Sequence, residues 1–400
     1  MANLDKRRFL FYSHDTFGLG HIRRSQKIAN KLASENHSIL IICSSPKAND
    51  FTSEPGVEYL KLPGFTKLKT GNYTARNLSM DLKDFTSFRS EIILSAVQNF
   101  KPDVLLVDKE PLGVCGELKP SLEHIKTKLK NCYKICGLRD ILDSPEKIKT
   151  EWEKRGSEEA LSGYYDSVFV YGDQSIFDLA EQYKLSETLK NKLKYVGYLI
   201  QDQMPKVENK ALELLDFGKS YNDKPLVLFT LGGGEDGSDF LEKIASALLL
   251  EPKKDVRNLV ITGPFLPQNK FNEIKTKLSG LDNTKCLRFT PVIKQVINSA
   301  HLVVSMGGYN TFCENLSLKK RPLILPRISP RLEQALRASI FSEIGFCSYI
   351  HPDSLTENSL SEKVSELLLD NKLPKINFKI NGLENAVDFL KSSTKKEFND

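Results

Sequence analysis

The sequence has little that would hold it in a membrane or carry it across one. No apolar run in its 400 residues approaches the roughly 20 residues that a membrane-spanning helix requires. The opening residues, MANLDKRR, lack the apolar segment of a secretory signal peptide. We therefore expect a cytoplasmic protein, and peripheral contact with the inner face of the membrane stays open.

The seven cysteines lack the spacing of a metal or redox motif. No two of them form a CxxC pair, and Cys132 and Cys136 have no neighbouring histidine or cysteine that would complete a metal site. An odd number of scattered cysteines is typical of reduced thiols in a cytosolic chain. The sequence therefore predicts no disulfide framework.

Charge is not concentrated as it is in nucleic-acid-binding proteins. The net charge of +6 fits an anionic substrate or an anionic membrane surface. No basic run is interleaved with aromatic residues, so we expect no nucleic-acid partner.

Alternating strand and helix patterns are present in both halves of the chain. Apolar runs such as SILIIC and DVLLVD predict buried strands in the first half, and PLVLFT restarts the pattern in the second. This alternation predicts an α/β fold of two Rossmann-like domains, with parallel sheets facing across a cleft. The expected parts are an N-terminal Rossmann-like domain at 1–200, a linker at 201–222, a C-terminal Rossmann-like domain at 223–375, and a helix and tail at 376–400. Whether that tail crosses back to the N-terminal domain stays open.

A histidine stands where a glycine loop opens the first helix, in HDTFGLGH. Gly18 and Gly20 form the loop, and His21 follows at the helix N-terminus, where the helix dipole disfavours a second positive charge. A neutral imidazole accepts protons, so His21 is a candidate general base, and Asp108 at the end of DVLLVD is its candidate partner. In the alternative reading, His21 caps the helix or binds phosphate, and Asp108 contacts the acceptor or caps the next element.

Three glycines directly follow a predicted strand in FTLGGGEDG. Gly232, Gly233 and Gly234 allow a ligand to approach the backbone closely. The stretch is neither a GxGxxG fingerprint nor a P-loop, so an ordinary tight turn is the alternative.

A second glycine turn, in VVSMGGYNTFCE, leads from a strand into a helix. Behind Gly307 and Gly308, the N–H groups of Asn310 and Thr311 are placed to cradle a diphosphate. Glu314, about one turn further, is a candidate for accepting both hydroxyls of a ribose, or it only favours the helix dipole. In RLEQALRA, Glu333 and Gln334 begin another helix, where they bind sugar hydroxyls or lie in a solvated first turn.

These motifs resemble those of GT-B glycosyltransferases. The C-terminal half resembles glycosyltransferase family 28 through LGGGEDG, ITGP, FTPVIKQVINSAHLVVSMGGYNTFCENLSLKKRPLILPR and RLEQALRA. GLGH occupies the position of that family's glycine-rich loop and histidine. PDVLLVDKEPLG, GLRDILDSP and YYDSVFVYGD resemble a less characterised subgroup of predicted glycosyltransferases.

The resemblance implies a metal-independent transfer of a sugar from a nucleoside-diphosphate donor, with UDP as the nucleotide, to the hydroxyl of a small-molecule or lipid-linked acceptor. It implies these donor contacts: Glu314 to the ribose, Gly307, Gly308, Asn310 and Thr311 to the diphosphate, Glu333 and Gln334 to the sugar, and the backbone from Thr290 to Val292 to the base. The chain contains no Asp-x-Asp, the motif with which GT-A enzymes hold a metal, so we expect no metal and no cofactor. The Glu-Gln pair differs from the Gln-Gln or Asp-Gln of relatives, which leaves the donor sugar open.

Three other functions stay open: a nucleotide-sugar hydrolase, with which GHIRR is compatible, a nucleotide-sugar 2-epimerase, and a catalytically silent nucleotide-sugar binding protein.

A further segment, 61–76, carries Lys61, Lys67, Lys69 and Arg76 without an acidic residue, together with Leu62, Phe65, Leu68 and Tyr73. We expect it to dock on an anionic membrane or a lipid-linked acceptor, with a solvated surface loop as the alternative.

Overall fold

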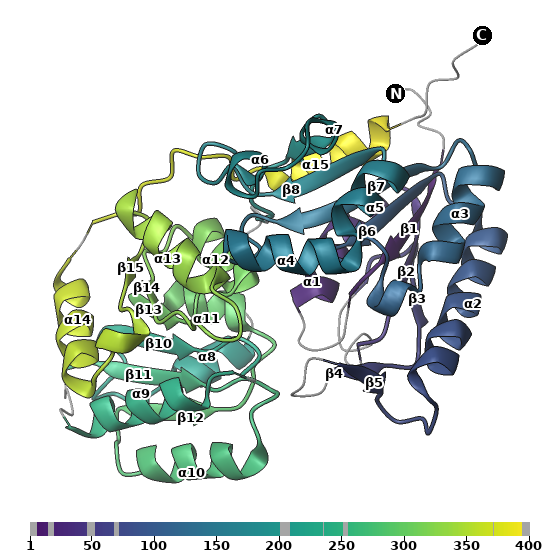
Figure 1. The fold of residues 1–400 in the computed structure, drawn as a ribbon. Helices are drawn as coiled ribbons and strands as arrows, with labels where there is room; N and C mark the ends of the chain where they lie inside the picture. Colours follow the sequence, from purple (N-terminus) through teal and green to yellow (C-terminus); the bar gives the residue numbers. More distant parts are fainter. Residues whose placement is uncertain are drawn as a thin grey trace. The chain divides into compact units, whose positions relative to one another are not determined.

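The chain forms two compact units (Figure 1). The first contains residues Met1–Leu199 and Phe378–Asp400, and the second contains Ile200–Asn377. The computed structural model describes residues 6–14, 20–45, 53–67, 72–200, 209–234, 236–250, 255–370 and 372–393.

A seven-stranded parallel sheet, in the order β3-β2-β1-β6-β7-β8-β9, forms the centre of the first unit. Its strands are β1 (Arg8–Tyr12), β2 (Ser38–Cys43), β3 (Val57–Lys61), β6 (Val104–Asp108), β7 (Tyr133–Arg139), β8 (Ser167–Tyr171) and β9 (Leu193–Tyr195). All five residues of β6 are buried, as expected where helices cover both faces of a parallel sheet.

Helices and one hairpin surround this sheet. The helices are α1 (Gly20–Ala33), α2 (Leu82–Phe100), α3 (Lys119–Lys128), α4 (Pro145–Arg155), α5 (Ser157–Tyr164), α6 (Leu179–Gln182), α7 (Glu187–Lys190), α15 (Gly382–Ser392) and the short η2 (Val114–Gly116). The antiparallel hairpin of β4 (Phe65–Lys67) and β5 (Tyr73–Ala75) packs next to α2.

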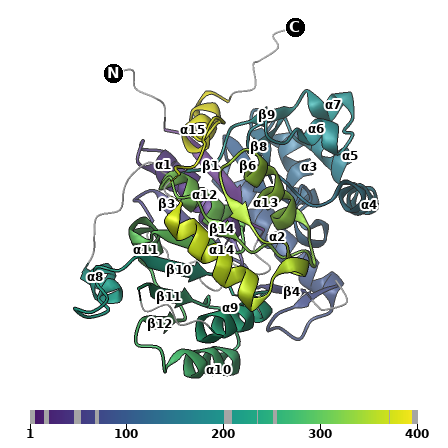
Figure 2. The same ribbon diagram turned by 90° about the vertical axis from the view of Figure 1, so that its left-hand side faces the viewer.

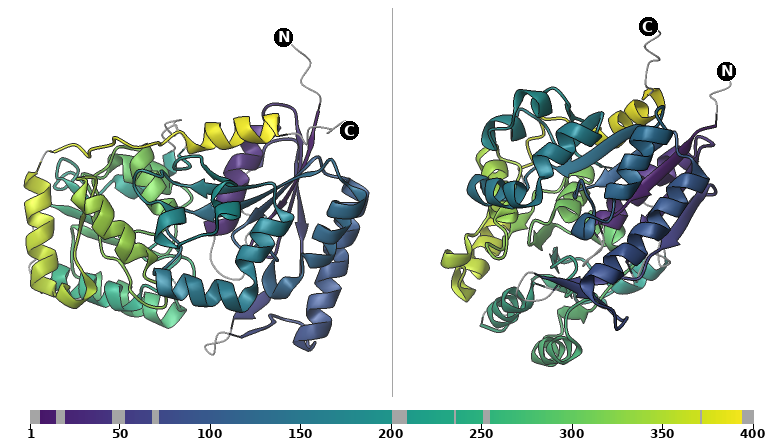
Figure 3. Two further views of the ribbon diagram at one scale, coloured as in Figure 1. Left: turned by 45° about the horizontal axis from the view of Figure 1, so that its top comes forward. Right: turned by 45° about the vertical axis from the view of Figure 1, so that its right-hand side comes forward.

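The C-terminal helix α15 belongs to the first unit, although it follows the second unit in the chain. It lies along α1 (Figure 3). The Arg7 guanidinium donates to the carbonyl oxygens of Leu390, Lys391 and Ser393 at 3.0, 2.7 and 2.6 Å. These bonds join the start of β1 to the end of α15.

The second unit is built around a six-stranded parallel sheet in the order β12-β11-β10-β13-β14-β15. Its strands are β10 (Leu226–Thr230), β11 (Arg257–Ile261), β12 (Thr284–Leu287), β13 (Leu302–Ser305), β14 (Leu323–Ile324) and β15 (Ser348–Tyr349). Its helices are α8 (Asn209–Leu215), α9 (Ser238–Leu250), α10 (Gln268–Leu278), α11 (Ile293–Ser299), α12 (Tyr309–Ser317), α13 (Glu333–Glu343), α14 (Glu357–Leu369) and the short η3 (Pro352–Ser354).

Alternate residues of β10 point to two different cores. Val227 and Phe229 join the core formed with α9, α10 and α14, and Leu226 and Leu228 join the one formed with α8 and α11. These helices and β10 are labelled in Figure 2. Helix α8 lies within residues 201–222, the stretch expected to be a linker, and its Ala211 is fully buried in the second core.

Each sheet reverses its strand order at one point, between β1 and β6 in the first unit and between β10 and β13 in the second. Ligands of open α/β sheets bind at such switch points, beyond the carboxyl ends of the strands. The predicted α/β class with parallel sheets is confirmed.

Among the helices of the described residues, none is both long enough and apolar enough to cross a membrane.

Candidate active site

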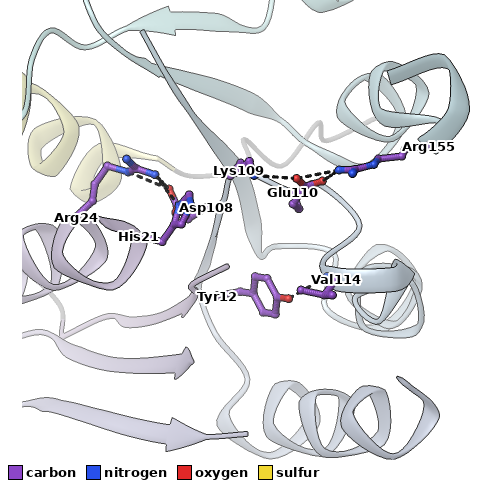
Figure 4. Close-up of polar contacts among 8 residues, drawn as sticks. All are labelled: Tyr12, His21, Arg24, Asp108, Lys109, Glu110, Val114 and Arg155. Atoms are coloured by element: carbon purple, nitrogen blue, oxygen red, sulfur yellow. Dashed lines mark hydrogen bonds and ion pairs between the residues drawn. The ribbon is translucent and has the colours of Figure 1, made fainter. Parts of the chain in front are cut away.

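Asp108 ends β6 at the switch point of the first unit, and its two carboxylate oxygens have different partners (Figure 4). The imidazole Nδ1 of His21 hydrogen-bonds to Oδ2, and Nε of Arg24 donates to Oδ1 at 2.9 Å. His21 and Arg24 lie three residues apart on α1, so their side chains leave the helix on the same face. The fold therefore brings His21 and Asp108 together, along with Arg24, which sequence reasoning missed.

Burial determines how this cluster is charged. The side chains of His21, Asp108 and Arg24 are 17%, 4% and 3% exposed. Burial lowers the pKa of His21 to about 4, aided by Arg24 and Lys109 and opposed by Asp108. Burial alone would raise the pKa of Asp108, but the Arg24 charge and the contacts with His21 hold it below its usual range. At neutral pH, Asp108 is a carboxylate and only accepts, so Nδ1 of His21 carries the ring proton and Nε2 is an acceptor.

A second histidine, also missed, follows β1 at the same sheet edge. The His14 side chain is buried, and its Nδ1 has no hydrogen-bond partner among the residues that the structure describes. Its ring meets that of His21 edge-on, with the centroids 5.6 Å apart. Burial, with the Lys109 charge, lowers the pKa of His14 well below its ordinary value. The signal was the position of His14 directly after a strand.

Charged groups continue beyond Asp108. Lys109 takes a left-handed conformation with φ of 73°, and Glu110 then lies within 3.3 Å of Lys109 Nζ and 3.0 Å of an Arg155 nitrogen (Figure 4). Burial opposes ionisation of Glu110, but Lys109 and Arg155 hold its pKa below the usual range. Beneath them, the Tyr12 hydroxyl donates to Glu117 at 2.6 Å and accepts from the Val114 N–H at 3.1 Å.

The glycine loop after β10 packs against the chain's own backbone. Gly232 and Gly234 have φ of 63° and 82°. A Cβ on Gly234 would collide with the Thr262 carbonyl oxygen, so contact with the turn after β11 requires glycine there. The tight-turn alternative thus accounts for Gly234, whereas the one described atom near a Cβ on Gly232 would be the Thr311 hydroxyl oxygen, at 4.0 Å.

The turn after β13 has the geometry of an anion-binding helix start. Gly307 has φ of 78°, and a Cβ there would lie 2.7 Å from Cγ2 of Ile324. Gly308 is the N-cap of α12, and in the described parts of the chain no heavy atom other than those of its neighbours lies within 4 Å of where its Cβ would be. Asn310 and Thr311 lie in the first turn, whose N–H groups point toward the helix N-terminus, and Glu314 lies one turn further on α12.

Arg337 supports this turn from α13 and was not predicted. Its side chain is buried, and one guanidinium nitrogen donates to the Gly307 carbonyl oxygen at 3.2 Å. The guanidinium also lies 5.8 Å from the centre of the Tyr309 ring. A buried cation therefore lies next to the candidate diphosphate cradle.

Glu333 and Gln334 begin α13, but the alternative of a solvated first turn is wrong, since both side chains are buried. Arg327 binds both. Its guanidinium lies 2.8 Å from the Glu333 carboxylate, and its backbone N–H donates to Gln334 Oε1 at 3.3 Å. At the start of α11, Thr290 and Val292 are buried, and the Thr290 hydroxyl accepts from the Val292 N–H at 3.2 Å.

Part of the expectation for segment 61–76 is wrong. Leu62 and Phe65 are core residues, which are 2% and 0% exposed. The Phe65 ring packs edge-on against that of Phe85 on α2. Arg76 donates to the carbonyl oxygens of Phe65 and Ser44 at 3.0 and 3.3 Å, which gives it a structural role. Gly20 begins α1. Gly18, Leu68 and Lys69 lie outside the described residues.

Polar groups lie at the switch points of both sheets. Residues 227–392 match the glycosyltransferase family 28 C-terminal domain. The resemblance expected for the C-terminal half is thereby confirmed. This family 28 match contains the Gly307 turn, Glu314, Glu333 and Gln334, and extends through α15.

Curated relatives match over a similar length. A UDP-N-acetylglucosamine--N-acetylmuramyl-(pentapeptide) pyrophosphoryl-undecaprenol N-acetylglucosamine transferase from Streptococcus pneumoniae strain Hungary19A-6 is 30% identical over 159 residues. The TIGR4 strain protein matches equally well. The match covers 39% of this chain and 42% of the relative, so the chain spans less than half the length of the curated relatives it matches.

Solved structures share the whole fold. MurG of Acinetobacter baumannii has a TM-score of 0.60 at 12% identity, with 97% of this chain and all of that chain covered. A proposed UDP-N-acetylglucosamine 2-epimerase from Listeria monocytogenes has a TM-score of 0.63 at 14% identity, with 97% of this chain and 96% of that chain covered. At these identities the likeness concerns the fold alone. The predicted GT-B fold with two parallel sheets is confirmed.

Proposed function

We propose that the protein is a glycosyltransferase that moves a sugar from a nucleoside-diphosphate donor, with UDP as its nucleotide, to an acceptor hydroxyl. One observation carries the proposal: the family 28 match contains the β13–α12 turn, and that turn lies at the switch point of its sheet. A diphosphate fits there because helix N-termini bind anions through backbone N–H groups and the helix dipole.

In the proposed donor site, Gly307, Gly308, Asn310 and Thr311 bind the diphosphate and Glu314 binds the ribose hydroxyls. Glu333 and Gln334, held by Arg327, contact the sugar. The backbone from Thr290 to Val292 faces the base. The α12 N-terminus and the Arg337 charge stabilise the leaving nucleoside diphosphate, so we propose transfer without a metal, and EDTA should leave the rate unchanged.

In the proposed reaction, Nε2 of His21 takes the proton of the acceptor hydroxyl. The hydroxyl oxygen bonds to the anomeric carbon as the bond from that carbon to the diphosphate oxygen breaks, and the nucleoside diphosphate leaves. Asp108 stabilises the imidazolium that forms. Positioned general bases contribute about 10² to 10⁴ in rate.

We further propose that the first unit contacts an anionic membrane at its inner face, where a lipid-linked acceptor would lie. Four large apolar side chains between β5 and the first turns of α2 support this: Leu78, Met80, Leu82 and Phe88 are 45%, 38%, 39% and 40% exposed. Lys61 and Lys83 lie nearby in the chain and are exposed. Basic residues near an anionic surface contribute about 1 kcal/mol each, and the apolar side chains would enter the interfacial layer.

Vesicle co-sedimentation tests the membrane contact. We expect more pelleting with anionic than with neutral vesicles, lost at high salt and lost in Leu78→Ser/Met80→Ser/Leu82→Ser. The control is Leu249→Ser/Leu250→Ser, which changes two exposed leucines of the second unit. Equal weak pelleting with both vesicle types would exclude the contact.

A thermal-shift screen over UDP, GDP and dTDP and their sugars tests the function. A ligand at 100 Kd stabilises by about 2.7 kcal/mol, so UDP-sugars should raise Tm most. Incubation of the stabilising donor without acceptor then separates the classes: slow release of nucleoside diphosphate fits a transferase, rapid stoichiometric hydrolysis a hydrolase, and an epimeric sugar an epimerase. Absence of any shift would overturn the proposal.

A further inference from the structure

Arg24 is a buried cation in the candidate active site of the first unit. Its side chain is 3% exposed, and its Nε donates to Oδ1 of Asp108 at 2.9 Å. The Tyr171 ring of β8 covers the guanidinium, with its centre 5.1 Å away. Gly137 of β7 makes room for that ring, because a Cβ there would collide with the Tyr171 hydroxyl.

The contacts of Arg24 assign the two oxygens of Asp108 to separate partners. Two nitrogens of the guanidinium donate to Oδ1, and Oδ2 is bound by Nδ1 of His21. A carboxylate held at one oxygen by a planar fork cannot rotate freely, so the direction of its other oxygen is fixed. The ring orientation of His21 then follows from that direction.

We propose that Arg24 is a positioning residue for His21: by holding Oδ1 of Asp108, it directs Oδ2 to Nδ1 of the imidazole, so that Nε2 is the ring nitrogen that accepts a proton. The geometry belongs to the first unit alone. Only its catalytic meaning rests on the proposed function.

The positive charge of Arg24 also acts on the protonation of the His21 ring. One of its nitrogens lies 3.1 Å from Nδ1 of His21. Among the described residues, the titratable and charged groups that face His21 are Asp108 and Lys109 at the end of β6, Arg24 on α1, and His14 after β1. With burial, Arg24 and Lys109 favour the neutral ring, and Asp108 favours the imidazolium. Loss of Arg24 should therefore raise the pKa of His21.

Imidazole NMR tests the proposal without any substrate. The chain has six histidines, so long-range ¹H–¹⁵N spectra of ¹⁵N-histidine protein are simple, and His21→Gln assigns the His21 signals. In the wild type, His21 should be the Nδ1–H tautomer at pH 7 and should titrate near the lowered pKa of about 4. An Nε2–H tautomer in the wild type would overturn the proposal.

Two substitutions separate the charge of Arg24 from its shape. Arg24→Gln should give a mixture of tautomers and raise the titration midpoint by about one pH unit. Arg24→Lys keeps the charge without the fork, so the midpoint should stay low while the tautomers mix. Arg23→Gln changes the neighbouring residue on α1 and should alter neither.

The signals of the other five histidines show whether each variant is folded. A folded Arg24→Gln protein with the wild-type tautomer and midpoint would contradict the proposal. If Arg24→Gln does not fold, Arg24→Lys and the wild-type spectra still decide it.

Kinetics then test the catalytic meaning. With the donor found by the thermal-shift screen, Arg24→Gln should lower kcat roughly tenfold or more while the donor KM stays close to wild type, because the base alone is affected. If no donor turns over, the proposed function fails while the NMR result stands.

Discussion

The imidazole of His14 meets that of His21 edge-on, with the ring centroids 5.6 Å apart and the planes at 89°. Burial lowers the pKa of both rings, that of His21 to about 4. The unfolded chain titrates its histidines near pH 6.5. Between about pH 6.5 and 4 the unfolded state therefore binds more protons than the folded state, so stability is lost as the pH falls.

This linkage predicts an acid-sensitive first unit. Each histidine contributes up to about 1.4 kcal/mol per pH unit to the slope, and His14→Phe should make the slope shallower by up to that amount. Trp152, the one tryptophan of the chain, lies on α4 of the first unit, so its fluorescence reports urea unfolding of that unit. Parallel slopes for His14→Phe and the wild type between pH 7.5 and 5.5 would contradict the linkage.

His21→Ala should lower kcat by about 10² to 10⁴ while the protein remains folded, because the reaction loses its proposed base. Donor binding, measured by calorimetry, should change little. Turnover within about threefold of the wild type would remove His21 from that role.

Glu314→Gln should weaken UDP binding about tenfold to a hundredfold, since a hydrogen bond to a charged group contributes about 1.5 to 3 kcal/mol. Isothermal calorimetry with UDP measures the effect. Glu343→Gln, at the exposed end of α13, is the matched control. Equal affinity in the two variants would exclude Glu314 from the ribose site.

Gly307→Ala should destabilise the second unit by about 1 to 3 kcal/mol, because alanine disfavours a positive φ and its Cβ would lie 2.7 Å from Ile324. A Cβ on Gly280 meets no atom of the described residues within 4 Å, so Gly280→Ala is the control. Scanning calorimetry compares the two. If both variants melt alike, the close contact between Gly307 and Ile324 is not a constraint on the fold.

Local sequence pattern was enough to predict the framework and the strand-to-helix turns. The run VLLVD is apolar because β6 is buried throughout, and GGYN predicts a helix start because glycine allows the turn at Gly307 that α12 follows. Such signals lie within a few residues of one another, so they can be read without the fold.

Contacts between distant residues could not be predicted in this way. The partner of Arg24 lies 84 positions further along the chain, and Arg337 reaches back 30 positions to Gly307. Leu62 and Phe65 stand among lysines, which suggested an exposed apolar segment, but Phe85 of α2 covers Phe65. Only tertiary packing distinguishes a buried phenylalanine from an exposed one next to the same basic residues.

The position of α15 has a consequence for the order of folding during synthesis. Residues 378–393 dock on the first unit, yet the ribosome makes them only after the whole second unit. Domains fold as units while the chain emerges, at about 5 to 20 residues per second. The first unit therefore cannot be completed until its last helix, which packs against α1, and the carbonyls that Arg7 binds have been made. A released chain that ends at residue 377 should show a protease-resistant second unit and a protease-sensitive first one.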